Sequence, residues 1–256
     1  MRPNSLKQKL INQEQTYGSW ITMAHPLIPD ILAPAGFDWL AVDMEHSSID
    51  LADLLPLLIS IEANGIVPLV RVGEVNPNLI KRVMDAGTYG VIAANICSAE
   101  DVKKVVSAVK YSPEGSRGVG FYRAQAFGNK IESYFKWVKE QSVVIVQIEH
   151  IAAVNEIEEI FAVPGIDAFM IGPNDLSGSM NKPCQFDDPE VIASIEKVLE
   201  AGKKYNLPAG YHVMSPDPVE AAKWRERGFK FLGLSLDSIF LGDSVKKALQ
   251  SLKNEC

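Results

Sequence analysis

Short apolar runs and longer amphipathic segments alternate along almost the whole chain. Eight runs are rich in β-branched and aliphatic residues, which is typical of strands. They fall at residues 19–23, 39–45, 67–72, 91–96, 143–149, 166–171, 208–213 and 229–236. Eight segments with apolar residues at helical spacing lie between and after them. These fall at residues 51–63, 78–86, 99–109, 131–139, 153–161, 189–205, 219–227 and 239–252.

Regular alternation of strands and helices predicts a (β/α)8 TIM barrel, formed as a single domain by residues 1–256. The run at 143–148 is apolar on both faces, as a parallel strand between a barrel interior and outer helices must be. A doubly wound open sheet is the competing fold. It lacks support because no Gly-x-Gly-x-x-Gly motif opens a helix after an early strand.

Composition indicates which binding partners and which cellular compartment to expect. The net charge is −7 and basic residues are scattered singly, so no nucleic-acid partner is expected. Residues 1–15 are polar and no apolar run is long enough to cross a membrane, so no membrane partner is expected either. Three cysteines without metal-ligand spacing indicate reduced thiols. We expect a soluble, cytoplasmic protein.

Carboxylates follow two of the predicted strands, at the barrel end where chemistry is expected. Glu149 and Asp175 are oxygen donors, and two carboxylates with waters and a chelating substrate suit Mg²⁺ or Mn²⁺. The alternative is that both residues cap the helices that follow, as Asp175 is able to do. Gln147 lies two residues before Glu149 and faces the same side of its strand, which favours the metal site.

Other strand ends carry a histidine and an arginine. His46 follows Asp43 and Glu45, and it is either a base that works near neutral pH or a surface histidine at a helix entry. Arg71 lies between valines and needs an anion, which is either Asp43 or a substrate oxyanion. His150 and His212 are expected to have indirect or surface roles.

Lysines fall mainly on predicted helices and loops. The one strand lysine, Lys230, lies at the start of its strand, which is the wrong end for catalysis. A Schiff-base mechanism is therefore disfavoured.

Six ordered motifs between about Gly36 and Asp237 resemble the HpcH/HpaI aldolases, the class II, metal-dependent pyruvate aldolases. They are Gly36-Phe37-Asp38-Trp39 with Asp43-Met44-Glu45-His46, Val70-Arg71, Met84-Asp85-Ala86-Gly87, Arg117-Gly118-Val119-Gly120 with Arg123-Ala124, Val146-Gln147-Ile148-Glu149, and Ile171-Gly172-Pro173-Asn174-Asp175-Leu176-Ser177.

The resemblance implies roles that spacing alone does not give. His46 resembles the general base, Arg71 the group that stabilises an enolate, and Asp85 the residue that raises the basicity of the histidine. Substrate contacts are implied for Gln147, Asn174 and Asp175. Metal ligands are implied at Glu149 and Asp175, for Mg²⁺ or Mn²⁺ and, less readily, Co²⁺ or Zn²⁺.

The implied reaction is reversible cleavage of a 4-hydroxy-2-oxo acid to pyruvate and an aldehyde through a metal-stabilised enolate. Decarboxylation of an oxaloacetate-type acid and cleavage of a citryl-CoA-like thioester are the alternatives on the same barrel. A non-catalytic binding or scaffold protein is a further one. The retained set of His46, Arg71, Glu149 and Asp175 argues against that last alternative.

The chain departs from the family pattern at two places near the barrel mouth. Ala93-Ala94-Asn95-Ile96 replaces the common Val-Pro-Met-Val, and Asn181 stands where glycine is common. Neither change removes a predicted ligand, and both are expected to bear on aldehyde preference.

The resemblance also implies a homo-oligomer, a dimer or a trimer of dimers, in which the last helix is often exchanged between subunits. The apolar stripe of Leu241, Val245 and Leu249 permits this exchange but would equally pack on its own barrel. Asp85 ends a helix and is expected at the bottom of its own barrel. It therefore acts either across a subunit contact or indirectly.

Overall fold

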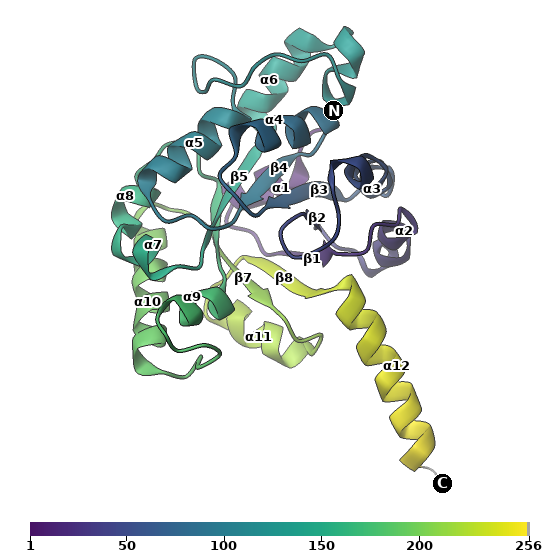
Figure 1. Ribbon diagram of the computed structural model, residues 1–256, viewed down its shortest axis with the longest axis vertical. Coiled ribbons are helices and arrows are strands. Elements are labelled where there is room, and N and C mark those ends of the chain that lie inside the picture. Colours follow the sequence, from purple (N-terminus) through teal and green to yellow (C-terminus); the bar gives the residue numbers. More distant parts are fainter. Residues whose placement is uncertain (255–256) are drawn as a thin grey trace.

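Eight parallel strands close into a barrel in chain order, β1 to β8, in the computed structural model, which describes residues 1–254 (Figure 1). The strands are β1 (Thr16–Ile21), β2 (Trp39–Asp43), β3 (Val67–Val72), β4 (Gly90–Ala93), β5 (Val143–Ile148), β6 (Ala168–Ile171), β7 (Ala209–Val213) and β8 (Phe231–Leu236). The predicted single-domain (β/α)8 barrel is confirmed. All carboxyl ends of the strands consequently open at one mouth.

Helices pack around the barrel and at one end of it, and the last helix, α12, extends away from it (Figure 1). They are α1 (Ser5–Ile11), α2 (Leu27–Leu32), η1 (Ala33–Ala35), α3 (Leu51–Ala63), α4 (Pro77–Ala86), α5 (Ala99–Val109), η2 (Arg123–Gly128), α6 (Ile131–Gln141), α7 (Ile151–Asn155), α8 (Ile157–Phe161), α9 (Pro173–Ser179), α10 (Pro189–Lys204), α11 (Pro218–Glu226) and α12 (Asp237–Asn254). No helix among the described residues is both long and apolar enough to cross a membrane.

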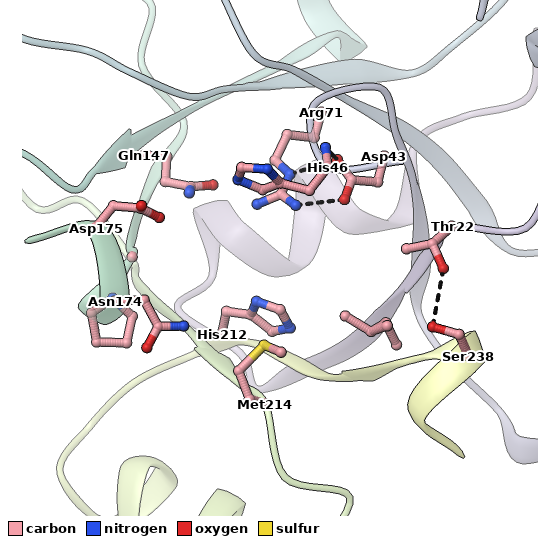
Figure 2. A pocket seen from close by; sticks show the side chains of 13 residues that line it. Thr22, Asp43, His46, Arg71, Gln147, Asn174, Asp175, His212, Met214 and Ser238 are labelled. Carbon is pink, nitrogen blue, oxygen red and sulfur yellow. Dashed lines mark hydrogen bonds and ion pairs between the residues drawn. The ribbon is translucent and has the colours of Figure 1, made fainter. Parts of the chain in front are cut away.

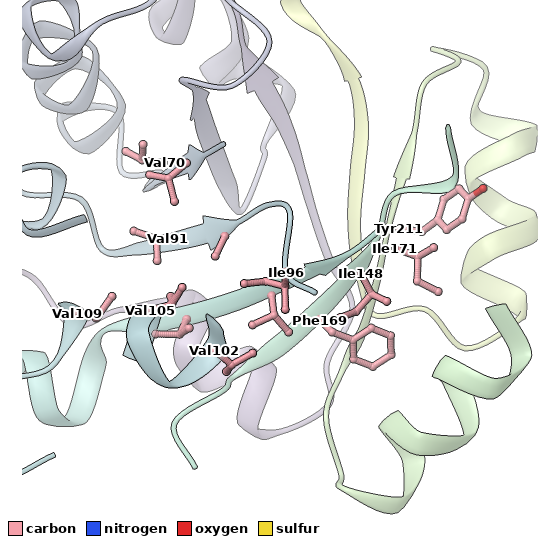
Figure 3. Close-up of a cluster of buried hydrophobic side chains, with 14 of the residues drawn as sticks. Val70, Val91, Ile96, Val102, Val105, Val109, Ile148, Phe169, Ile171 and Tyr211 are labelled. Atoms are coloured by element: carbon pink, nitrogen blue, oxygen red, sulfur yellow. The ribbon is translucent and has the colours of Figure 1, made fainter. Parts of the chain in front are cut away.

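The core has two layers, as the two apolar faces of the strands predict. Figure 3 shows part of the outer layer, where valines of the strands pack on the helices. The inner layer fills the barrel, and Trp39 stacks there on Phe231 with ring centroids 4.3 Å apart. Gly18 leaves room for this stack, because a Cβ at that position would lie 2.0 Å from the Trp39 ring. A packed interior confines ligands to the mouth.

Helix α1 closes the opposite end of the barrel, which the sequence did not predict. Leu6 and Leu10 are 0% and 2% exposed and belong to the inner layer. Lys7 forms an ion pair with Asp167, and Lys9 bonds Asp38 at 2.6 Å; both acids directly precede a strand. Two apolar residues among polar ones suffice here because only one side of the helix faces the barrel.

Candidate active site

Side chains from the carboxyl ends of the strands surround a cavity of about 390 Å³ (Figure 2). It is lined by Thr22, Asp43, His46, Arg71, Gln147, Gly172, Pro173, Asn174, Asp175, His212, Met214, Leu236 and Ser238. Five of the seven predicted site residues therefore meet here: His46, Arg71, Gln147, Asn174 and Asp175. Glu149 lies directly beneath Gly172, and Asp85 lies elsewhere.

Arg71 is held by Asp43 in a buried two-point ion pair. Its Nε lies 2.9 Å from Asp43 Oδ1 and its Nη2 lies 2.6 Å from Oδ2. The guanidinium also lies over the Trp20 ring, 4.3 Å from the centroid. Burial alone would raise the pKa of Asp43, but the hydrogen bonds and charge of Arg71 hold that pKa below its usual value. Asp43 is thus the structural anion that the sequence left open, and the pair fixes the direction of the arginine.

A substrate oxyanion is not excluded by this pairing. Within residues 1–254, Nη1 of Arg71 has no protein hydrogen-bond partner, and Arg71 lines the cavity. An arginine that is oriented through one edge and open at another is a preorganised donor for a developing negative charge.

Glu149 is buried at the end of β5, with 3% of its surface exposed. Its Oε1 accepts a hydrogen bond from the Asn95 backbone N–H at 2.6 Å, and its Oε2 accepts one from the Gln147 side chain. Burial raises the pKa of Glu149 to about 7, with the nearby carboxylates of Glu45 and Asp175 adding to the rise. This buried acid has no basic side chain bonded to it among the described residues, so it fits a site for a cation.

Gly172 permits the close approach of the Glu149 and Asp175 segments. A Cβ on Gly172 would lie 2.8 Å from Glu149 Oε2 and 3.1 Å from Gln147 Nε2. Helix α9 starts at the next residue and carries Asp175 in its first turn. A side chain on Gly172 would push the two elements apart.

Neither carboxylate caps a helix, which was the alternative to a metal site. The N-cap of α9 is Gly172 and this end has no side-chain cap bond. The N-cap of α7 is His150, whose Nδ1 accepts from Ala152 N–H at 3.1 Å. Helix ends therefore do not account for the positions of Glu149 and Asp175, and His150 is an exposed residue that caps a helix, in agreement with the expected surface position.

Glu45 and Asn95 also lie at the site; the sequence placed both at strand ends, with Asn95 near the barrel mouth, but predicted no contact for either residue. The Asn95 side chain donates to Glu45 Oε1 and to the Gly73 carbonyl, both at 2.8 Å. Asn95 adopts a positive φ of 55°, which asparagine tolerates better than most residues. Burial raises the pKa of Glu45, although Arg71 and His46 oppose the rise. The available signal in the sequence was the departure from the family pattern at Asn95, which lies at the site.

His46 lies at the rim of the cavity. Its side chain is 60% exposed, and its Nε2 lies 3.8 Å from Glu45 Oε2. The position is compatible with both sequence interpretations: the ring is open to solvent, and it lines the cavity beside Arg71.

His212 was expected to have an indirect or surface role, yet it lines the cavity. Burial, with the charge of Arg71 second, lowers its pKa to about 4. The side chain is therefore a neutral imidazole at physiological pH.

Asp85 lies outside this cavity. At the end of α4 it accepts hydrogen bonds from Arg117 and from Gln125, the latter at 2.8 Å. It lines a separate hollow with residues that include Arg82 and Tyr122. Within one chain, the structure does not bring Asp85 to His46. Asn181, the second departure, has a positive φ of 60° and does not line the cavity.

Two negative findings bear on the chemistry. No lysine lines the cavity, in agreement with the argument against a Schiff base. Over residues 1–254, no group of three or more His, Cys, Asp or Glu side chains is arranged to hold a metal ion. Any cation would thus have two carboxylate ligands and need water or substrate oxygens to complete its shell.

Comparison with known proteins agrees with the site. A family model described as HpcH/HpaI aldolase/citrate lyase matches residues 16–242. The 5-keto-4-deoxy-D-glucarate aldolase of Enterobacter sp. (strain 638) is 31% identical over 252 residues, which are 98% of this chain and 97% of that protein.

Two solved structures are also similar over nearly the full length. One is an HpcH/HpaI aldolase/citrate lyase family protein from Burkholderia cenocepacia J2315, with a TM-score of 0.92, 35% identity, and coverage of 98% of this chain and 99% of that one. The other is the citrate synthase SbnG, with a TM-score of 0.87, 27% identity and 98% coverage of both chains. These matches confirm the predicted enzyme class, a carbon–carbon lyase of the aldolase type. The chain belongs to the HpcH/HpaI aldolase/citrate lyase family.

Proposed function

We propose that the protein reversibly cleaves a 4-hydroxy-2-oxo acid to pyruvate and an aldehyde with the help of a divalent metal ion. The observation that carries this proposal is the meeting of Asp175, Gln147 and the oriented Arg71 around one cavity, with the buried Glu149 next to it and bonded to Gln147. Cleavage of a 2-oxo acid needs carboxylates that hold a cation and an arginine that stabilises the negative oxygen of the enolate.

The residues fit a hard divalent cation. Glu149 and Asp175 supply carboxylate oxygens, and the pKa rise of Glu149 reflects burial without a compensating positive partner. Gln147 Oε1 is buried and has no hydrogen-bond partner among residues 1–254, and Glu45 Oε2 meets Arg71 Nε only as an ion pair at 3.4 Å. Buried oxygens without a hydrogen bond are costly unless a donor or cation satisfies them. Mg²⁺ or Mn²⁺ suits this all-oxygen set, with Co²⁺ or Zn²⁺ as less fitting substitutes.

When bound, a divalent cation supplies Lewis-acid stabilisation of negative charge on the 2-oxo oxygen. The chain supplies the remaining steps. His46 removes the proton from the C4 hydroxyl, directly or through a water, and the C3–C4 bond breaks to release the aldehyde. Arg71 Nη1 donates to the oxygen of the resulting enolate. The proton that His46 removed is returned, directly or through a water, to C3 of the enolate and gives pyruvate. Gln147 and the main chain of Asn174 position the pyruvate half.

Substrate chemistry is supported by the relatives. The Enterobacter relative is named for a keto-deoxy sugar acid, which belongs to the proposed substrate class. The citrate synthase likeness and the family description favour the CoA-thioester alternative in part. Against it, Arg71 is the only lysine or arginine among the residues that line the cavity, so the phosphates of CoA find little complementary charge there.

A substrate panel tests the proposal. The metal-free protein, prepared with EDTA and then given Mg²⁺ or Mn²⁺, is assayed for pyruvate release from several 4-hydroxy-2-oxo acids, for oxaloacetate decarboxylation and for citryl-CoA cleavage. We expect pyruvate release that needs the metal and that exceeds the other two activities. Full activity in EDTA would refute the metal requirement, and cleavage of the thioester alone would refute the aldolase assignment.

A further inference from the structure

His212 projects into the cavity from β7, on the wall that faces Arg71 and His46 (Figure 2). Asn174 lies to its left and Met214 below it in this view. Its ring packs on Trp20, with centroids 5.2 Å apart, and a short polar wall formed by Thr22 and Ser238 lies further along the rim. The mechanism proposed above assigns no role to this half-buried histidine.

One hydrogen bond fixes which nitrogen of His212 carries the proton. Nε2 lies 3.3 Å from the carbonyl oxygen of Ser235. A carbonyl oxygen only accepts, so Nε2 must be the N–H donor, and in a neutral ring Nδ1 is then a bare acceptor. Burial and the positive charge of Arg71 keep the ring neutral.

The acceptor Nδ1 lacks a protein partner. Among residues 1–254 no donor is bonded to it, and Figure 2 shows one ring nitrogen directed towards the cavity. His212 is only partly buried and its Nδ1 is not enclosed by protein, so a donor that enters the cavity can reach it. A ligand that fills the cavity excludes water from Nδ1, and the atom then needs a donor from that ligand, because leaving it unsatisfied is costly.

The position of His212 identifies the part of the substrate that it meets. The pyruvate half is directed to Gln147, Asp175 and Arg71 in the proposed function, on which this inference rests. The aldehyde half is left with the wall of His212 and Met214. An aldehyde oxygen is itself an acceptor and cannot bond to Nδ1, whereas a hydroxyl group can.

We infer that His212 binds a hydroxyl group of the aldehyde half through Nδ1, and that it selects hydroxyaldehydes over their deoxy analogues. A site that is built to bond a hydroxyl discriminates strongly against an analogue that lacks it, because the polar group that the analogue covers is then left unpaired. The low pKa of the imidazole makes it a poor base, so it binds the hydroxyl and leaves proton removal to His46.

The test compares aldol addition of pyruvate to glycolaldehyde and to acetaldehyde, which differ by one hydroxyl. We expect the ratio of the two kcat/KM values in His212→Leu to fall roughly tenfold or more below the wild-type ratio. Met214→Leu is the matched control: it changes the same wall without removing an acceptor, so its ratio should stay near that of the wild type.

Two further variants separate substrate binding from a merely structural role. In His212→Gln the amide replaces the Nε2 donor and keeps a bond to Ser235, but nothing replaces Nδ1. In His212→Asn the side-chain oxygen lies near the position of Nδ1, but the bond to Ser235 is lost. The inference requires the ratio to fall in the glutamine variant and to be partly kept in the asparagine variant.

Each outcome decides the matter. The opposite order of these two variants, or a leucine variant with the wild-type ratio, would overturn the role of His212 and leave the aldolase proposal standing. If the leucine variant does not fold, the glutamine and asparagine variants carry the same comparison. Absence of addition to any aldehyde by the wild-type protein would instead contradict the proposed function itself.

Discussion

At the scale of single residues, the site depends on which charges are paired and which are not. Arg71 is paired with Asp43, and its Nη1 stays open to the cavity. Glu149 is bonded by Asn95 and Gln147 but meets no basic group among the described residues. The first arrangement gives a fixed cation for substrate, and the second gives a strong site for an added cation.

Replacing Arg71 with alanine should lower the rate of pyruvate release by about a hundredfold or more, the usual effect of removing one oxyanion donor. Arg71→Lys should recover only part of this loss, because an ammonium group cannot bond Asp43 at two points and also reach the substrate. Steady-state kinetics measures the effect. Circular dichroism checks that the variant stays folded although Asp43 has lost its ion-pair partner. An Arg71→Ala rate near that of the wild type would refute the role.

Glu149 should make the stability of the metal-free protein depend on pH. Below its ordinary pKa of 4.5 the group is protonated in both states, whereas between 4.5 and about 7 only the folded state keeps the proton. The free energy of unfolding should therefore fall as pH rises through this window, by on the order of 3 kcal/mol. Urea unfolding in EDTA should show a shallower decline for Glu149→Gln. Equal slopes for the two proteins would contradict this account.

At the scale of elements, the sequence predicts best where the deciding interactions are local. The bounds of α3, β3 and α5 match their predicted ranges. Capping boxes mark the starts of both helices, Asp50 with Asp53 and Ser98 with Asp101. The short helices α1, α2 and α9 were not predicted, since each has seven residues or fewer and little periodicity of its own.

The site residues, too, were predictable only where their positions follow from the local sequence pattern. Strand ends identified Glu149, Asp175 and Arg71, because the barrel collects its carboxyl ends at one mouth. His212 was not identified, since its protonation and its place on the wall depend on Ser235 from β8 and on Arg71 from β3. Contacts between distant strands do not appear in the local pattern.

Helix α1 should stabilise the barrel although it is far from the mouth. Leu10 is 2% exposed and packs in the inner layer, so Leu10→Ala should lower the free energy of unfolding by about 2–5 kcal/mol. Ile11→Ala, on the 60% exposed side of the same helix, should change it little. Denaturant unfolding measures both. An equal loss in the two variants would mean that α1 does not close the barrel as described.

At the scale of the whole molecule, helix α12 has an apolar face that the described residues leave exposed. It extends away from the other elements in Figure 1. Its apolar stripe is largely exposed, from 51% at Val245 and 52% at Leu249 to 59% at Leu241 and 63% at Leu252. Such a stripe is typical of a contact with another protein surface. We propose that α12 packs on a second copy of the chain, the helix exchange that the family resemblance implies.

Asp85 links the proposed assembly to catalysis. In its own chain it is bonded to Arg117 and Gln125 and does not line the cavity of His46. A role of Asp85 in raising the basicity of His46 therefore requires the acid of a neighbouring subunit. If so, assembly and catalysis are lost together, and the isolated barrel keeps its cavity without this residue.

The double substitution Val245→Asp and Leu249→Asp should break the assembly, because two carboxylates would enter an apolar contact. We expect the wild-type protein to sediment as a dimer or a trimer of dimers and the variant as a monomer, with the melting temperature of the barrel largely kept. Gln250→Glu, which adds a charge on the side of α12 away from the stripe, should leave the assembly intact. Pyruvate release should fall with dissociation if Asp85 acts across the contact. A monomeric wild-type protein would contradict assembly through α12. A monomeric variant with full activity would contradict the action of Asp85 across the contact.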